Sequence, residues 1–139
     1  MSGEKITVQV SINSTLEKVW NAMTLPEHIT NWYFASPDWH APKATNDLRV
    51  GGKFMTRMEA KDQSFGFDFE GEYTFLELHK RYDYILEDKR EIAVIFEEKN
   101  GFVTVTEIFD PENENPIEMQ QQGWQMILDN FKKYVESLG

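Results

Sequence analysis

The chain has 139 residues, a length typical of one domain, and we predict a single domain over residues 1–139. Its formal net charge of −10 repels phosphate backbones and anionic lipid head groups, so we expect neither nucleic acid nor a membrane as a partner. It contains no cysteine, which excludes disulfides and thiolate metal sites and fits a cytoplasmic location.

The sequence lacks the short motifs of common catalytic and cofactor sites. The three histidines, His28, His40 and His79, have no partner at the i, i+4 spacing of a helical metal site, and no HExxH motif occurs. There is no GxSxG motif, no phosphate-binding glycine loop and no cysteine nucleophile. We therefore predict no metal and no cofactor.

The first third of the chain predicts one strand, two short helices and a loop. Apolar and polar residues alternate over residues 6–12, as in a strand with one buried face. An apolar stripe over residues 16–23 predicts a short helix, and a second is expected from Pro26 to about Trp32. Residues 34–46 carry two prolines and are expected to form a long irregular connection.

Five further strands are predicted between residues 48 and 109. Their expected ranges are 48–59, 65–75, 82–86, 92–96 and 102–109. A turn at residues 61–64 would place Phe54, Thr56 and Met58 opposite Gly71, Phe69 and Phe67. Successive strands imply antiparallel hairpins, so we predict an α+β fold with a curved six-stranded antiparallel sheet.

The last helix is the most clearly patterned segment. Asn115 is a suitable N-cap and Pro116 suits the first helical position. Apolar residues then recur at helical spacing at positions 124, 127, 128, 131, 135 and 138. A helix over residues 116–138 would be roughly 35 Å long and would cross the whole domain. Gly123 interrupts this pattern, either to allow close packing or to leave space for a ligand.

One carboxylate is predicted to lie on an apolar face. The Asn100-Gly101 turn sets the register of the last hairpin and places Glu107 opposite Val94, among apolar residues. In a structural interpretation, Glu107 reaches solvent at the strand end or pairs with a donor such as Trp124 or a tyrosine hydroxyl. In a functional interpretation, it faces a water-filled cavity and acts as an acid, a base or a ligand anchor.

Several segments together resemble a known family. Residues 47–54 (DLRVGGKF), 67–73 (FDFEGEY) and 123–131 (GWQMILDNF) resemble homologues of the activator of the heat-shock-protein-90 ATPase, and residues 35–40 resemble the bacterial single-domain subgroup. These proteins belong to the START-like (SRPBCC) superfamily, with the helix-grip fold of the birch pollen allergen. The resemblance covers nearly the whole chain. It implies a hydrophobic cavity between a curved sheet and the C-terminal helix, and it supplies no fixed catalytic residues.

From these patterns we expect a protein that binds a small, largely apolar molecule between the helix and the sheet. Glu107 or His40 would be its polar anchor. The expected lining consists of Trp20, Trp32, Trp39, Phe54, Phe67, Phe69, Tyr73, Val105, Gly123 and Trp124. The first alternative is a cyclase or dehydratase that uses Glu107 as acid or base. The second is a chaperone-partner module, which ranks last because the eukaryotic co-chaperone has a further N-terminal domain that we do not find here.

Overall fold

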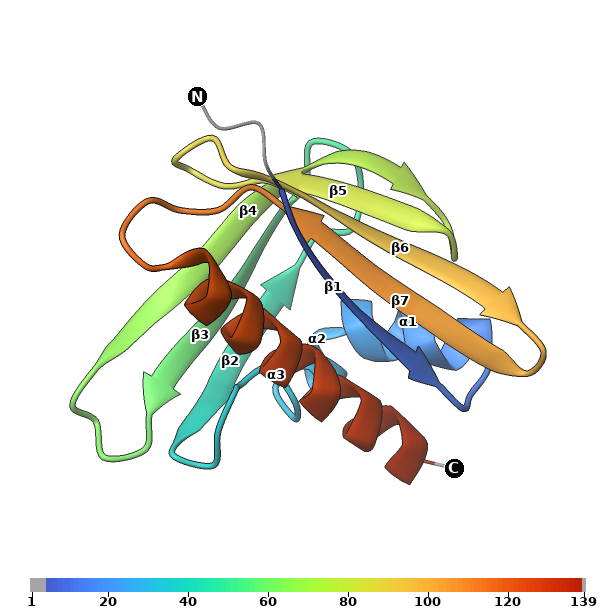
Figure 1. Ribbon diagram of the computed structural model, residues 1–139, viewed down its shortest axis with the longest axis horizontal. Helices are drawn as coiled ribbons and strands as arrows, with labels where there is room; N and C mark the ends of the chain where they lie inside the picture. Colours follow the sequence, from blue (N-terminus) through green and yellow to red (C-terminus); the bar gives the residue numbers. More distant parts are fainter. Residues whose placement is uncertain (1–4, 139) are drawn as a thin grey trace.

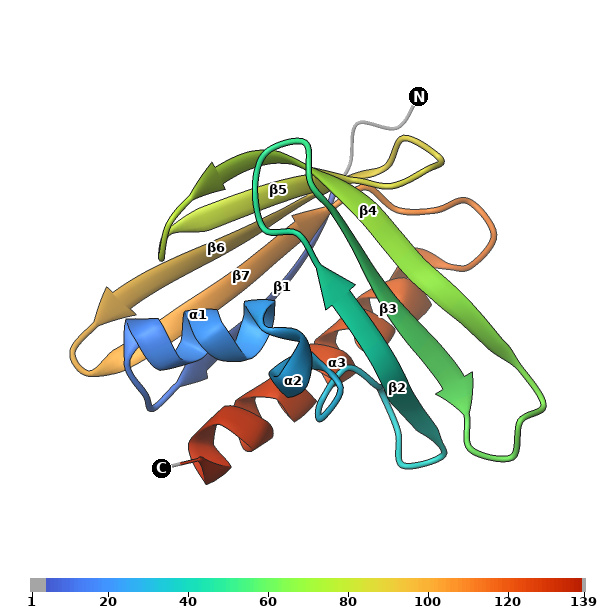
Figure 2. The same cartoon turned by 180° about the vertical axis from the view of Figure 1, so that it is seen from behind.

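The computed structural model describes residues 5–138, and it confirms the α+β helix-grip architecture (Figures 1 and 2). Within these residues, the elements in chain order are β1 (Ile6–Ile12), α1 (Leu16–Thr24), α2 (Pro26–Ile29), β2 (Trp39–Asn46), β3 (Lys53–Ala60), β4 (Gly66–Glu77), β5 (Arg81–Ile85), β6 (Glu91–Lys99), β7 (Phe102–Phe109) and α3 (Ile117–Ser137). The ends of the predicted domain, residues 1–4 and 139, lie outside the described part of the chain.

The strands form one antiparallel sheet in the order β1-β7-β6-β5-β4-β3-β2. The sheet curls around α3, which crosses its concave side, while α1 and α2 lie beside the C-terminal half of α3 (Figures 1 and 2). Because side chains alternate along a strand, each strand sends every second residue toward this concave side. The space between sheet and helix is therefore lined by residues from most of the chain.

The structure corrects the predicted strand count. The sheet described over residues 5–138 has seven strands instead of six, because residues 39–46 form β2 rather than a loop. β2 is an edge strand, it contains Pro42, and its pairing with β3 shifts register between His40 and Lys43. A proline and a bulge are tolerated at a sheet edge, and both disturb the alternation by which a strand is recognised in a sequence.

Both predicted hairpin registers are confirmed. Phe54 pairs with Gly71 and Met58 with Phe67 across β3 and β4. Val94 pairs with Glu107 across β6 and β7. The Asn100-Gly101 turn has positive φ at both residues, which is the backbone that a tight two-residue hairpin needs.

Helix α3 supplies the other wall of the core. Leu128, Phe131 and Val135 are each at most 1% exposed and pack against the sheet. The predicted cap differs by one residue: Pro116 is the N-cap, and its carbonyl accepts hydrogen bonds from the amides of Met119 and Gln120. None of the described helices is both long and apolar enough to cross a membrane.

Polar side chains of α3 also bond the outer edge of β1. The side-chain Nε2 of Gln121 donates to the backbone carbonyl of Thr7 (3.2 Å). The Gln125 side chain accepts from the Gln9 amide (3.3 Å) and donates to the Gln9 carbonyl (3.0 Å), as a neighbouring strand would. This edge of the sheet is thus occupied by the helix that crosses it.

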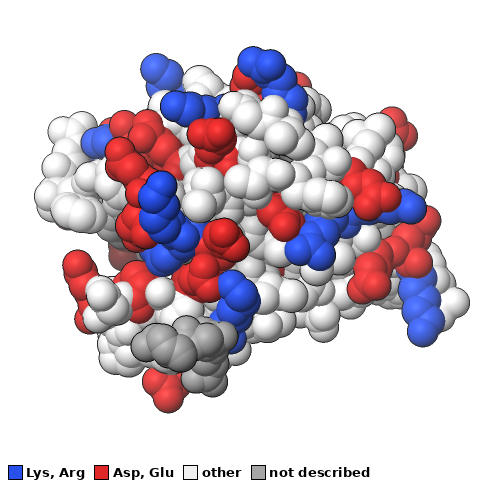
Figure 3. Space-filling model, turned by 90° about the horizontal axis from the view of Figure 1, so that it is seen from above, with Lys and Arg blue, Asp and Glu red and all other residues white. Residues whose placement is uncertain are grey.

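Charged side chains of both signs cover the surface. On the face shown in Figure 3, Lys and Arg side chains lie among Asp and Glu side chains. Arg57, for example, contacts both Glu59 (2.9 Å) and Asp68 (3.2 Å), and Asp68 is its partner in the register of β3 and β4. Such exposed pairs contribute little to stability.

Candidate functional site

Glu107 lies on the concave side of the sheet, as the hairpin register predicts. It is flanked by Val8 on β1 and Val94 on β6, both of which are buried. Its side chain is enclosed by protein but keeps part of its surface accessible, and that surface faces the two spaces described below. The interpretation in which Glu107 reaches bulk solvent at the strand end does not fit this position.

The Glu107 carboxyl has no hydrogen-bond donor among residues 5–138, and Trp124 is not its partner. Trp124 instead stacks on Phe109, with ring centroids 3.8 Å apart. Loss of hydration disfavours the charged form of a carboxyl, and enclosure accordingly raises the pKa of Glu107 to about 8. At neutral pH this group is therefore mainly a carboxylic acid, which can donate a hydrogen bond as well as accept one.

Tyrosine side chains surround this carboxyl. Tyr82 and Tyr84 point inward from β5, and Tyr33 follows α2. Burial raises the pKa of all three hydroxyls above the usual range, and the nearby Glu107 raises them further. Tyr73, on β4, donates to Asn46 Oδ1 (2.6 Å), and burial raises its pKa too. The tyrosines consequently remain protonated throughout the physiological range.

These groups line a small cavity, the inner chamber, of about 30 Å³. Its wall consists of Met23, Ile29, Tyr33, Thr45, Asn46, Phe54, Thr56, Tyr73, Tyr82, Tyr84 and Glu107. A cavity of this size and polarity can hold a water molecule or one small polar group, because about 10–15 Å³ of such volume suffices for a water. It is too small for a whole ligand.

A second and larger space, the outer groove, lies between the sheet and the N-terminal half of α3. It measures about 250 Å³, and its wall consists of Tyr33, Met58, Phe67, Phe69, Arg90, Glu107, Glu112, Gln120, Trp124 and Ile127. Apolar side chains of β3, β4 and α3 make up its interior, and its polar members are Arg90, Glu107, Glu112, Gln120 and the Tyr33 hydroxyl. The groove and the chamber share two wall residues, Tyr33 and Glu107.

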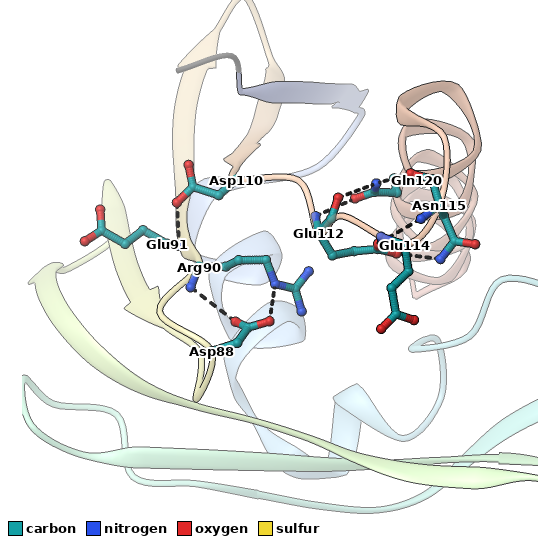
Figure 4. Close-up of polar contacts among 8 residues, drawn as sticks. All are labelled: Asp88, Arg90, Glu91, Asp110, Glu112, Glu114, Asn115 and Gln120. Carbon is teal, nitrogen blue, oxygen red and sulfur yellow. Dashed lines mark hydrogen bonds and ion pairs between the residues drawn. The ribbon is translucent and has the colours of Figure 1, made fainter. Parts of the chain in front are cut away.

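A hydrogen-bonded loop between β7 and α3 forms one rim of the groove (Figure 4). The buried Gln120 side chain accepts from the Glu112 amide (2.9 Å) and donates to the carbonyls of Glu112 (3.0 Å) and Asn115 (2.8 Å). Across from it, Arg90 is held by Asp88 (2.8 Å), and its guanidinium lies between Asp88 and the loop (Figure 4). Gln120 thus positions the rim, and Arg90 brings a positive charge to it.

The structure brings six of the predicted site residues to these spaces. Phe67, Phe69, Glu107 and Trp124 line the groove, and Phe54, Tyr73 and again Glu107 line the chamber. Gly71, between Phe69 and Tyr73 on β4, creates room for them, because a Cβ at this position would lie 2.7 Å from the Phe54 ring.

The other predicted lining residues lie elsewhere. Trp20, Trp32 and Val105 are at most 2% exposed and belong to the packed core; Trp20 contacts Tyr82, and Trp32 contacts Phe131. Trp39 sits at the start of β2 against Phe65 and Phe67, outside the groove wall.

His40 and Gly123 also line neither space. His40 pairs with Glu59 across β2 and β3, with 3.4 Å between His40 Nε2 and Glu59 Oε1, so Glu107 rather than His40 faces the cavity. A Cβ at Gly123 would meet nothing within 4 Å, so this glycine is not required for close packing.

Sequence reasoning missed several members of the site. Tyr82 and Tyr84 were detectable, because their alternation within a predicted strand places both on one face. Tyr33, Arg90, Glu112 and Gln120 lie in or beside loops or near a helix start, where no periodic pattern relates them to the cavity.

A larger hollow of about 510 Å³ opens near the turn that follows β5. Lys53, Glu70, Glu72, Glu87 and Lys89 are among its wall residues, so charged and largely solvated side chains form much of it. Ligand sites are typically enclosed and mostly apolar, which favours the outer groove as the candidate site.

Comparison with known proteins identifies relatives over the whole fold. The family model described as "Activator of Hsp90 ATPase homolog 1-like protein" matches residues 13–136. The solution structure of an AHSA1-like protein from Aeromonas hydrophila is 44% identical, with a TM-score of 0.92, and the match covers 98% of this chain and 94% of that one. A protein from Cytophaga hutchinsonii is 45% identical, with a TM-score of 0.84 and the same coverage.

A more distant structure, titled the Aha1 dimer from Colwellia psychrerythraea, shares the fold alone. It is 15% identical, with a TM-score of 0.75, and the match covers 96% of both chains. No protein of curated function matches this chain.

Proposed function

The chain belongs to the family of Activator of Hsp90 ATPase homolog 1-like proteins, and from this premise we propose that it binds a small, largely apolar molecule in the outer groove. The observation that carries the proposal is Glu107, a carboxyl without a protein donor among residues 5–138 that faces both the groove and the chamber. An unpaired carboxyl on an apolar face costs several kcal/mol. A structural role alone does not account for keeping it there.

The groove has the composition of a ligand site. Phe67, Phe69, Trp124 and Ile127 supply apolar surface, and a few polar groups converge on it. At about 250 Å³ the groove is just below the usual range of about 300–1,000 Å³ for small-molecule sites, which suits a compact ligand such as a fused two-ring compound.

An enzyme that uses Glu107 as a general acid or base is the second candidate. The pKa of about 8 favours it, because a general acid or base works best with a pKa near the working pH. Turnover would require Glu107, and replacement by Gln would abolish it. A binding protein would instead keep its ligand with altered affinity, so product formation by the native chain separates the two functions.

The binding proposal is tested by what the native protein carries and by filling the groove. Organic extraction and mass spectrometry of the purified native protein should identify a small apolar compound. The larger side chain in Ile127→Trp would fill the groove, so this variant should carry no such compound. Met126→Trp is the matched control, since Met126 is the neighbouring residue, is 48% exposed and is not on the groove wall.

Added ligand should raise the melting temperature of the native chain and of Met126→Trp, because binding to the folded state alone stabilises it by about 2.7 kcal/mol at a hundredfold excess over Kd. Equal compound content and equal thermal shifts in Ile127→Trp and the native chain would contradict binding in the groove.

A further inference from the structure

The outer groove and the inner chamber form one site with two different ends. They share Tyr33 and Glu107, so a molecule in the groove would reach the chamber at these two side chains. The groove has room for an apolar body, whereas the chamber of about 30 Å³ has room for one polar group of the size of water. The chemistry of the chamber therefore decides which group a ligand places there.

The chamber contains more hydrogen-bond donors than its own residues use. Tyr73 is satisfied, because its hydroxyl donates to Asn46, whose amide in turn donates to the Thr24 carbonyl. Within residues 5–138, by contrast, the Tyr82 hydroxyl and the Glu107 carboxyl have no hydrogen-bond partner in the protein. The Tyr33 and Tyr84 side chains lie on the same chamber wall, next to these two groups.

We propose that the ligand places a carbonyl oxygen in the inner chamber, where the Glu107 carboxyl and the Tyr82 hydroxyl donate hydrogen bonds to it, with the Tyr33 hydroxyl beside them. This inference rests on the proposed binding function, and it names the chemical class of the ligand: an apolar molecule of one or two rings that carries a ketone or aldehyde.

The protonation of the chamber suits such an oxygen. Enclosure keeps Glu107 protonated at neutral pH, so its O–H is a donor, and the raised tyrosine pKas keep the hydroxyls neutral. A carbonyl oxygen accepts two hydrogen bonds and needs to donate none. An acidic ligand group is unsuited to the chamber because Arg90 lies on the groove wall, outside the chamber.

An amine is the competing chemistry, because an ammonium would pair with ionised Glu107 and contact the tyrosine rings. The volume and the free donors favour the carbonyl, and the experiment below separates the two. Three probes share one skeleton: 2-acetonaphthone carries the carbonyl, 2-ethylnaphthalene lacks the oxygen, and 1-(2-naphthyl)ethylamine carries the amine. Their affinities for the full chain are measured at pH 7 by competition or calorimetry.

We expect the ketone to bind roughly tenfold more tightly than the hydrocarbon, the gain of about one net hydrogen bond. Tighter binding of the ketone would be informative, because transfer from water into an apolar site by itself favours the hydrocarbon. Glu107→Leu and Tyr82→Phe should each reduce the ratio of the two affinities, while Glu107→Gln, which keeps an N–H donor, should reduce it less. The matched control is Glu97→Gln, an exposed glutamate on β6, and it should leave the ratio unchanged.

Two further readouts report on the carbonyl itself. The C=O stretching frequency of carbonyl-labelled 2-acetonaphthone should fall on binding to the native chain and rise again in Glu107→Leu. The affinity ratio should hold up to about pH 8 and fall above it as Glu107 loses its proton. The other titratable groups that share the chamber wall with Glu107 are Tyr33, Tyr73, Tyr82 and Tyr84, and Arg90 and Glu112 lie on the groove wall.

Each outcome decides the inference. Equal affinity for the ketone and the hydrocarbon, or tightest binding of the amine, would overturn the carbonyl assignment and leave groove binding intact. Binding of none of the three probes up to their solubility would contradict the proposed function, and the inference would fail with it. A ratio that survives in Tyr82→Phe, Glu107→Gln and Glu107→Leu alike would show that the oxygen lies outside the chamber.

Discussion

A carboxyl group that lies between two buried valines must lose its charge or gain a partner as the chain folds. Glu107 loses its charge: its pKa rises from 4.5 to about 8 because it is removed from water. Between these two values the folded protein holds a proton that the unfolded chain has released. The free energy of unfolding therefore falls as pH rises through this window, by at most about 1.4 kcal/mol per pH unit.

Glu107→Gln removes this titration while preserving shape. We expect the variant to match the wild type near pH 4.5 and to exceed it increasingly up to about pH 8, by roughly 3 kcal/mol at pH 7 as an upper value. Urea unfolding followed by circular dichroism from pH 5 to 9 measures the difference. Glu97→Gln should show no such trend. A flat difference between Glu107→Gln and the wild type would mean that Glu107 is solvated or paired.

Two glycines offer a matched test of the packing around the chamber. A Cβ at Gly71 would lie 2.7 Å from the Phe54 ring and 3.1 Å from Tyr84, whereas one at Gly123 would meet nothing within 4 Å. Gly71→Ala should therefore cost about 1–3 kcal/mol through overpacking. Gly123→Ala should stabilise the protein by about 0.5–1 kcal/mol, because alanine is the better helix former.

Denaturant midpoints of the two variants decide this prediction. A loss of stability in Gly123→Ala would show that something packs against this position after all. A neutral Gly71→Ala would show that Phe54 moves aside freely and that the chamber wall is soft.

Individual site residues were predictable where a turn sets the register. The Asn100-Gly101 hairpin determines which residues of β7 face inward, so the position of Glu107 among apolar neighbours follows from the sequence. The same logic fails for Tyr33 and Arg90, which lie in connecting segments without a period. Whether Glu107 is solvated or enclosed also depends on how α3 packs over it, and no local pattern specifies that.

At the scale of elements, the contact between α3 and β1 combines packing with edge protection. Gln125 bonds both backbone groups of Gln9, and Lys132 donates to the carbonyl of Ser11 (2.7 Å). An unpaired edge strand is a template for pairing with another chain. The glutamines of α3 occupy this edge without adding an eighth strand to the sheet.

Gln125→Ala should expose this edge. We expect it to lower the free energy of unfolding by about 0.5–1.5 kcal/mol and to accelerate hydrogen exchange of the Gln9 amide. Gln122→Ala is the matched control, because Gln122 lies on the same helix and is exposed. Equal exchange rates at Gln9 in the two variants would mean that the side chain of Gln125 does not protect the strand.

The elements themselves differ in how far they could be predicted. Strands with one buried face and the amphipathic α3 carry strong periodic signals, and their pairing follows from the turns between them. β2 carries no such periodic signal, since its proline, its bulge and its polar edge position remove the alternation of apolar and polar residues. Its place in the sheet is set by tertiary pairing with β3.

At the scale of the whole molecule, the curled sheet and α3 enclose a site whose two ends differ in chemistry. The family was recognisable from short segments that resemble it, and the family model matches residues 13–136. The volumes of the groove and the chamber could not be predicted from the sequence, since they depend on how about twenty side chains pack together.

The most direct test of ligand binding in the groove is a nuclear Overhauser experiment on the isotope-labelled chain with unlabelled 2-acetonaphthone. We expect contacts from the naphthyl protons to the rings of Phe69 and Trp124 and to the Ile127 methyl groups. We also expect contacts from the acetyl methyl group to Tyr33 and Tyr82. Contacts confined to exposed side chains such as Phe65 and Leu78, with none to Trp124 or Ile127, would contradict ligand binding in the groove.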